Sequence, residues 1–149
     1  MIEYRRMTEA DIEAYIGLRV RQLREEGATE DVDLRPALRD YYARHLADGS
    51  FAAWLAVDEG RIVATSGMSF VEKPPYFGCP SGRIGLLSGM FTEPAYRRRG
   101  IARALLARVV DEARRHGCGA VQITASDVGV LLYTDFGFRK NGNFMQYTL

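Results

Sequence analysis

One stretch of the sequence places an apolar strand, a short turn rich in arginine and a long amphipathic helix in direct succession. Arg83 to Thr92 is largely apolar, and Pro94 ends this predicted strand because proline cannot donate a ladder hydrogen bond. Gly100 opens a helical pattern that stops at Gly117. A strand, a crossover helix and a returning strand form a right-handed unit. We therefore expect the next strand, Ala120 to Ala125, to lie parallel to the first.

The helix of this unit has one broad apolar stripe and one charged face. The stripe consists of Ile101, Ala102, Leu105, Leu106, Val109, Val110 and Ala113. The opposite face is predicted to carry Arg103, Arg108, Asp111, Glu112, Arg114 and Arg115. Such a stripe is typical of a helix that packs on a sheet.

The remaining sequence supplies further strands and helices around this unit. Thr8 and Asp11 form a capping-box pattern, which predicts a helix that ends near Gly27. The other predicted elements are a strand at Ile2 to Met7, a helix around Leu38 to Leu46, a hairpin of Phe51 to Val57 with Ile62 to Val71, a short helix at Val128 to Asp135 and a strand pair from Phe138 to Leu149 around Asn141-Gly142. This order predicts a mixed α/β sandwich with a mostly antiparallel sheet and one domain, residues 1–149.

Length and composition restrict the class of protein. A chain of 149 residues buries enough surface to fold without a metal or disulfide. A net charge of +1 argues against non-specific nucleic-acid binding. There is no apolar signal core and no membrane-length apolar run, so we expect a cytoplasmic protein. His116 and Cys118 fall short of the four ligands of a structural zinc site, and no metal is expected.

The turn before the amphipathic helix has the chemistry of an anion site. The first amides of a helix have no internal acceptor and lie at its positive end. Gly100 allows close backbone approach, and Arg97, Arg98 and Arg99 add positive charge. The alternative interpretation is a solvated basic turn that precedes an ordinary helix.

The same residues resemble the coenzyme A loop of the GCN5-related N-acetyltransferase (GNAT) superfamily, written Gln/Arg-x-x-Gly-x-Gly/Ala. Arg97, Gly100 and Ala102 match its fixed positions. The resemblance implies a GNAT-like fold with a splayed parallel strand pair, and acetyl-CoA as cosubstrate. It also implies cofactor contacts from the main chain of Met90, Phe91 and Thr92 and from the loop, Arg97, Arg98, Arg99, Gly100, Ile101, Ala102 and Arg103.

A second segment, Ser126 to Phe138, is similar to the family signature Asn-x-x-Ala-x-x-Leu-Tyr-x-x-x-Gly-Phe. Leu132, Tyr133, Gly137 and Phe138 match, whereas Ser126 and Gly129 replace the usual Asn and Ala. The resemblance implies that Tyr133 is the general acid for the departing thiolate and that Ser126 contacts the cofactor. The alternative is a core tyrosine that faces the sheet.

The base that neutralises an attacking amine is not evident from the sequence. The strand before the loop carries no carboxylate, so Glu25, Glu26 and Glu72 stay open as candidates. Tyr41, Tyr42, Phe70, Tyr76 and Phe77 either line an acceptor pocket or belong to the core and a surface loop.

The resemblance as a whole implies an acetyl-CoA-dependent N-acetyltransferase. Its partner would be a small-molecule or peptide amine acceptor, and a homodimer is compatible with the family. A hydroxyl acceptor or a longer acyl donor stays open. The alternative from another class is a catalytically silent acyl-CoA sensor or a partner-binding module.

Overall fold

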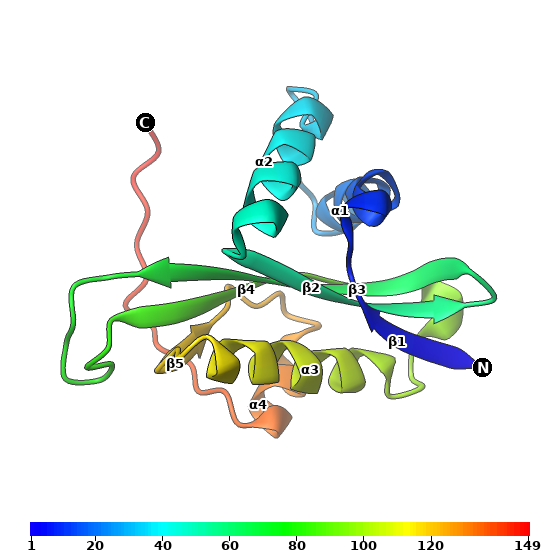
Figure 1. The fold of residues 1–149 in the computed structure, drawn as a ribbon. Helices are drawn as coiled ribbons and strands as arrows, with labels where there is room; N and C mark the ends of the chain where they lie inside the picture. The colour runs from blue at the N-terminus through cyan, green and yellow to red at the C-terminus, as the bar shows by residue number, and fades with distance from the viewer.

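A five-stranded sheet forms the middle layer of the computed structural model, which describes residues 1–149 (Figure 1). Its strands, in spatial as well as chain order, are β1 (Ile2–Arg6), β2 (Phe51–Asp58), β3 (Arg61–Glu72), β4 (Arg83–Thr92) and β5 (Ala120–Gln122). The first four strands pair antiparallel, and β4 with β5 is the parallel pair. The predicted fold class is therefore confirmed.

Helices cover both faces of the sheet. Figure 1 shows α1 (Ile12–Glu25) and α2 (Arg35–Asp48) on one face, and α3 (Ile101–Arg115) and α4 (Val130–Phe136) on the other. Two 3₁₀ turns, Glu9–Asp11 and Pro94–Tyr96, precede α1 and α3. None of the helices is both long and apolar enough to cross a membrane.

Local signals in the sequence set the ends of several elements. Thr8 and Asp11 form the predicted capping box before α1. Gly49 ends α2 in a left-handed conformation. The β2–β3 hairpin turns through Glu59 and Gly60, whose φ angles of 49° and 79° are both positive. Two positive φ angles match the right-handed twist of the flanking strands.

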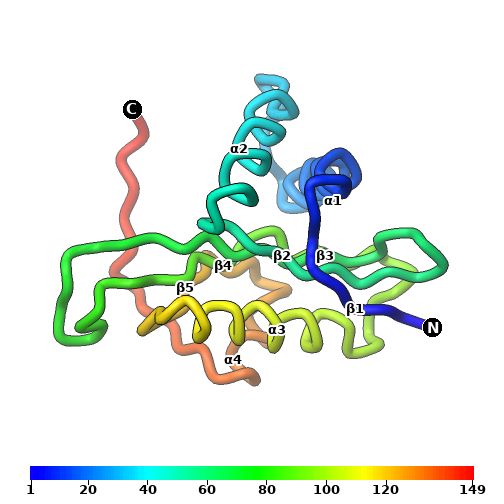
Figure 2. The backbone as a smooth tube through the Cα atoms, viewed as in Figure 1, coloured from blue at the N-terminus to red at the C-terminus, as the bar shows by residue number.

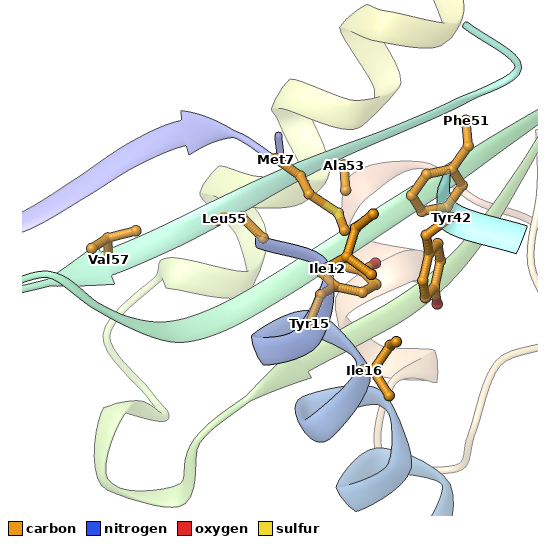
Figure 3. Packing of buried hydrophobic residues seen from close by; sticks show 9 residues of the cluster. All are labelled: Met7, Ile12, Tyr15, Ile16, Tyr42, Phe51, Ala53, Leu55 and Val57. Carbon is orange, nitrogen blue, oxygen red and sulfur yellow. The ribbon is translucent and has the colours of Figure 1, made fainter. Parts of the chain in front are cut away.

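The core lies on both faces of the sheet. Figure 3 shows the cluster between α1, α2 and the sheet, in which Tyr15, Tyr42 and Phe51 pack edge to face or tilted. On the other face, the α3 stripe is buried as predicted except at Ala102, which is half-buried, and Leu105, Leu106 and Val109 are fully covered. Burial of this kind contributes roughly 1.5–3 kcal/mol per large apolar side chain.

The prediction that Glu112 lies on the solvent face of α3 is wrong. Its carboxylate is fully buried. It accepts hydrogen bonds from Arg6 Nε at 2.6 Å and from Trp54 Nε1 at 3.0 Å. A buried carboxylate needs such partners. They come from β1 and β2, so the spacing of residues within α3 held no signal for them.

The predicted strand pair from Phe138 to Leu149 is also absent. A turn forms at Asn141-Gly142-Asn143, but no strand follows it, and β5 ends at Gln122 rather than Ala125. An isolated two-stranded hairpin is only marginally stable in water. Residues 138–149 do not pair with any strand of the sheet. The segment instead runs clear of α4 as an extended chain (Figure 2).

Candidate functional site

The parallel strands β4 and β5 separate after a short paired region. Pairing extends only from Ile84 to Leu86 on β4, opposite Ala120 to Gln122. Beyond Leu86, β4 continues to Thr92 along β3 but has no partner on its other edge. The backbone at Ser88, Met90 and Thr92, whose side chains are half-buried, therefore borders an opening in the sheet.

A bulge in β4 bends the strand at this opening. The β3–β4 register shifts between Thr65 and Gly67, and Gly89 has a φ of 63°. The Thr65 hydroxyl donates to the Gly89 carbonyl at 2.7 Å. The Tyr15 hydroxyl would lie 2.8 Å from a Cβ at position 89 and 2.6 Å from one at position 67. Both positions therefore require glycine.

Tyr15 carries a buried hydroxyl with no hydrogen-bond partner within the protein. Burial raises the pKa of Tyr15 well above its ordinary value of 10. The side chain stays neutral and fills the space behind the bulge. Its cost as an unsatisfied donor is on the order of 1–3 kcal/mol.

The turn between β4 and α3 presents a row of free amides. Arg98 and Gly100 both have left-handed backbones, with φ of 62° and 77°, and α3 begins at Ile101. The amides of residues 98–103 have no acceptor within the protein. No atom lies within 4 Å of a Cβ built at Gly100. This is an open, electropositive surface of the kind that binds phosphate oxygens.

The arginine side chains frame the turn and do not converge on one point. Arg97 Nε donates to the Thr92 carbonyl at 2.8 Å, and its Nη2 pairs with Glu25 at 2.9 Å. Arg99 lies over the Tyr96 ring, and Arg103 pairs with Asp135 at 2.8 Å. The side chain of Arg97 therefore ties the end of β4 to α1.

Two further contacts anchor the turn and were not predicted. The Tyr96 hydroxyl donates to Asp58 Oδ2 at 2.7 Å. The Glu93 carboxylate accepts from Arg21 at 3.0 Å and from Arg61 at 2.8 Å. These partners lie on α1 and on β2 and β3, and nothing in the local sequence pairs them with the turn.

Tyr133 lies in α4 with its ring buried against the sheet. The ring packs edge to face on Phe138, with centroids 5.6 Å apart. A Cβ at Gly129 would come within 2.8 Å of Tyr133 Cε2, so the glycine in place of the family's alanine makes room for the ring. Burial, and secondly the charge of Glu26, raise the pKa of Tyr133 to about 12.

Ser126 lies in the turn that precedes α4. Its Oγ accepts the Gly129 amide at 3.2 Å. The hydroxyl therefore stabilises the turn into α4, and its own proton is not donated within the protein. The Ser126 hydroxyl can therefore stabilise the turn and still donate a hydrogen bond to a ligand.

The end of α1 contributes a polar group that the sequence did not reveal. Gln22 Nε2 donates to the Met90 carbonyl at 3.3 Å and to Glu26 Oε1 at 3.2 Å. Glu26 is thereby held beside the β4 bulge. α1 and α4 cover opposite faces of the sheet (Figure 1), and the charge of Glu26 is the second cause, after burial, of the raised pKa of Tyr133.

The other two carboxylate candidates lie elsewhere or are paired. Glu25 is neutralised by Arg97. Glu72 ends β3 and faces Arg83 at 3.8 Å, at the opposite end of β4 from Thr92.

The aromatic side chains considered for an acceptor pocket do not come together. Tyr41 and Tyr42 pack with Phe51 between α2 and the sheet, whereas Phe70 stacks on His116 of α3 on the other face. Phe77 is fully exposed in the β3–β4 connection. These side chains therefore belong to the core and to a surface loop, which is the second of the two interpretations given for them.

Comparison with known proteins decides the family. The sequence model of the protein family described as the acetyltransferase (GNAT) family matches residues 13–138. The chain belongs to the GNAT acetyltransferase family. The family predicted from the sequence is thereby confirmed.

Similar GNAT proteins fall into curated relatives and solved structures. N-acetyltransferase 8 of Rattus norvegicus is 33% identical over 73% of this chain and 49% of the relative. Aminoglycoside N(6')-acetyltransferase type 1 of Salmonella enteritidis is 29% identical over 78% of this chain and 75% of the relative. The chain spans about half the length of the N-acetyltransferase 8 relatives that it matches.

A solved predicted acetyltransferase with acetyl-CoA from Clostridium acetobutylicum is 31% identical, with a TM-score of 0.95 over 99% of this chain and 96% of that one. A GCN5-related N-acetyltransferase from Ralstonia eutropha is 26% identical, with a TM-score of 0.92 over 99% of each chain.

Proposed function

We propose that this protein transfers an acetyl group from acetyl-CoA to an amine acceptor. The row of free amides at residues 98–103, beside the open edge of β4, carries this proposal. Acetyl-CoA supplies the activated acetyl group when it is bound. The complex of the Clostridium acetobutylicum relative with acetyl-CoA supports the choice of this donor.

The residues present fit the two chemically distinct parts of this cosubstrate. The pyrophosphate needs several donors and no steric obstacle, which the amides from Arg98 to Arg103 and the open space at Gly100 provide. The thioester arm needs an extended strand edge, which the main chain of Met90, Phe91 and Thr92 provides. Ser126 retains a hydroxyl proton for one further contact.

Tyr133 is assigned to the departing sulfur. The pKa of Tyr133 is about 12, whereas the pKa of a free thiol is near ~8.5. The phenol therefore does not transfer its proton fully to the thiolate. It donates a strong hydrogen bond to the developing charge instead. A nearby thiolate would raise the pKa of the phenol further. Tyr133 therefore keeps its proton and acts as a hydrogen-bond donor at every physiological pH.

Glu26 is assigned to the acceptor amine. An alkyl amine with a pKa near ~10.4 is almost entirely protonated at neutral pH and must lose a proton before attack. Gln22 holds the Glu26 carboxylate at the β4 bulge, whereas Glu25 is paired with Arg97. A carboxylate here attracts the ammonium form and accepts its proton directly or through water.

The atoms of the reaction balance with these roles. The amine nitrogen forms a bond to the thioester carbonyl carbon, and the carbon–sulfur bond breaks. The ammonium form gives one proton to Glu26 or to water before attack, and the nitrogen loses a second proton to water as the amide forms. The sulfur leaves as a thiolate hydrogen-bonded to Tyr133 and takes up a proton from Glu26 or from water. The products are an N-acetyl amide, the free thiol of coenzyme A and one proton released to solvent.

We assign an amine as the acceptor class. A hollow of about 620 Å³ opens beside the α1–α2 connection, and its wall carries Arg24 and Arg35 as well as Glu30, Asp31 and Asp33, so the charge of this hollow does not select among acceptors. The names of relatives, such as aminoglycoside N(6')-acetyltransferase, support this class. A peptide amine is the second form that the acceptor could take.

A silent acyl-CoA sensor is the rival function. A sensor has no need of the Tyr133 hydroxyl or of the Glu26 carboxylate. The test is release of free coenzyme A thiol from acetyl-CoA with a panel of polyamines, amino sugars and peptide amines. Thiol release that depends on one class of amine supports transfer, whereas tight acetyl-CoA binding without release from any amine supports the sensor.

A further inference from the structure

The two cysteines of the chain lie in neighbouring connections of the fold. Cys79 belongs to the connection between β3 and β4, and Cys118 lies between α3 and β5. Both thiols are free. Figure 1 shows the β3–β4 connection and the C-terminal end of α3 at one end of the sheet, and the N-terminal end of α3 at the other. The cysteines therefore share the end of the sheet that is far from the turn at Gly100.

The sulfur of Cys79 lies against the backbone next to Cys118. A Cβ built at Gly119 would come within 2.7 Å of Cys79 Sγ, so the glycine makes room for the sulfur. The Arg83 carbonyl accepts the Gly119 amide at 2.9 Å and the Cys79 thiol at 3.5 Å. One carbonyl oxygen thus joins the two connections, and the residue that follows Cys118 contacts the other cysteine.

Hydrogen bonds fix the backbone at both cysteines. Cys79 and Tyr76 exchange two backbone hydrogen bonds, at 3.0 and 3.3 Å. The Cys118 amide donates to the Ala113 carbonyl at 3.0 Å, directly after Gly117 with its φ of 74°, which is the Schellman end of a helix. The closeness of the two cysteines is therefore a property of the folded backbone.

The two thiols differ in their access to solvent. Cys118 is half-buried, whereas Cys79 is fully buried, so a dissolved reagent reaches Cys118 first. Burial, and secondly the charge of a Cys79 thiolate, raise the pKa of Cys118, and Arg83 opposes them. A raised pKa lowers the thiolate fraction at neutral pH. The pair should therefore react more slowly than an exposed thiol.

We propose that Cys79 and Cys118 form a reversible disulfide when a small disulfide such as glutathione disulfide oxidises the protein. The Cys118 thiolate attacks one sulfur of glutathione disulfide, which forms a mixed disulfide and releases one glutathione. The Cys79 thiolate then attacks the Cys118 sulfur, and the second glutathione leaves. The two cysteine protons pass to the two glutathione thiols, so two cysteines are oxidised and one glutathione disulfide is reduced.

The bond would close a loop that contains β4, the turn at Gly100 and α3. The free amides of residues 98–103 lie at the other end of β4 from the two cysteines (Figure 1). A disulfide across a loop of about 40 residues restricts the unfolded chain and leaves that turn untouched. The pair stays open in a reducing compartment, so the bond stabilises the fold only under oxidising conditions.

The first test is incubation of the native protein with glutathione disulfide, then alkylation of the remaining thiols, digestion with trypsin and mass spectrometry. The two cysteines lie in separate tryptic peptides, 62–83 and 116–139, so a disulfide-linked pair of these peptides identifies the bond. Its amount should not depend on protein concentration, and dithiothreitol should reverse it. Two thiols that stay free, or a mixed disulfide on Cys118 that Cys79 never displaces, would overturn the proposal.

Thermal unfolding measures the consequence of the bond. The oxidised native protein should unfold roughly 5–10 °C above the reduced protein. Cys79→Ala and Cys118→Ala should show no such shift after the same treatment, whereas Ser81→Ala, which keeps both thiols, should show it. A disulfide that leaves the unfolding temperature unchanged would contradict the stabilising role. Neither measurement depends on acetyl transfer, so failure here leaves the proposed activity untouched.

Discussion

Tyr133 lies in α4 and Glu26 directly follows α1, on opposite faces of the sheet, yet the charge of Glu26 is the second cause, after burial, of the raised pKa of Tyr133. β5 parts from β4 after Leu86, which leaves the edge of β4 open. In the proposed mechanism, Tyr133 is the hydrogen-bond donor to the thiolate and Glu26 the carboxylate that receives the protonated amine.

Replacement of Tyr133 by phenylalanine removes the donor for the departing thiolate and leaves the ring in place. We expect turnover to fall roughly 10²–10⁴-fold, with acetyl-CoA affinity changed less than about threefold. Steady-state kinetics and calorimetric titration measure the two quantities. The control is Tyr76→Phe in the β3–β4 connection, which should match the native protein. Full turnover in the Tyr133 variant would remove this residue from the mechanism.

Replacement of Glu26 by glutamine keeps the size of the side chain and removes its charge. The variant should lose activity most at neutral pH, roughly 10–100-fold, and recover toward pH 10, where more of the amine is already neutral. Glu25→Gln, which breaks only the exposed pair with Arg97, is the matched control. A deficit that is the same at pH 7 and pH 10 would argue against a role in deprotonation.

The raised pKa of Tyr133 predicts the alkaline side of the pH profile. Tyr133 needs its proton to act, and in the folded protein it keeps that proton until about pH 12. Turnover should therefore not decline between pH 8 and pH 10. Folding stability should decrease above about pH 10, because tyrosine in the unfolded chain releases its proton there while folded Tyr133 does not. An alkaline decline with a midpoint near 9 in a protein that circular dichroism shows to be folded would contradict this assignment.

Glu112 is a test of stability rather than activity. Glu112→Ala leaves Arg6 and the Trp54 indole without their acceptor. The Arg6 side chain is 57% exposed and can be solvated, so we expect a loss of about 1–3 kcal/mol. Urea unfolding followed by Trp54 fluorescence measures the loss. The neighbouring Asp111→Ala, at an exposed position of α3, should change stability by less than about 0.5 kcal/mol. Equal effects of the two substitutions would mean that the buried pair is energetically neutral.

The sequence predicted those local features whose residues are close neighbours along the chain. The turn at Gly100 before α3 and the helix that carries Tyr133 beside Gly137-Phe138 follow from local spacing. The roles of these residues toward a ligand stay predictions. Gln22 and Glu112 were missed because their partners lie 68 and 106 residues away along the chain. A polar residue on a helix carries no local mark of such a contact.

The strand predicted after Phe138 shows a different limit. Met145 to Leu149 alternates apolar and polar residues but forms no strand. A strand also needs an edge to pair with, and the periodicity of one segment does not say where that edge is.

The most direct test of the central claim is calorimetric titration with acetyl-CoA of the native protein, Gly100→Leu and Gly49→Leu. Gly100 and Gly49 have similar positive φ angles, 77° and 79°, and a Cβ at either position would meet no atom within 4 Å, so backbone strain is matched. The account predicts roughly micromolar binding, about −8 kcal/mol, by the native protein and Gly49→Leu, and its loss in Gly100→Leu alone. Unchanged binding by Gly100→Leu, or none by the native protein, would contradict it.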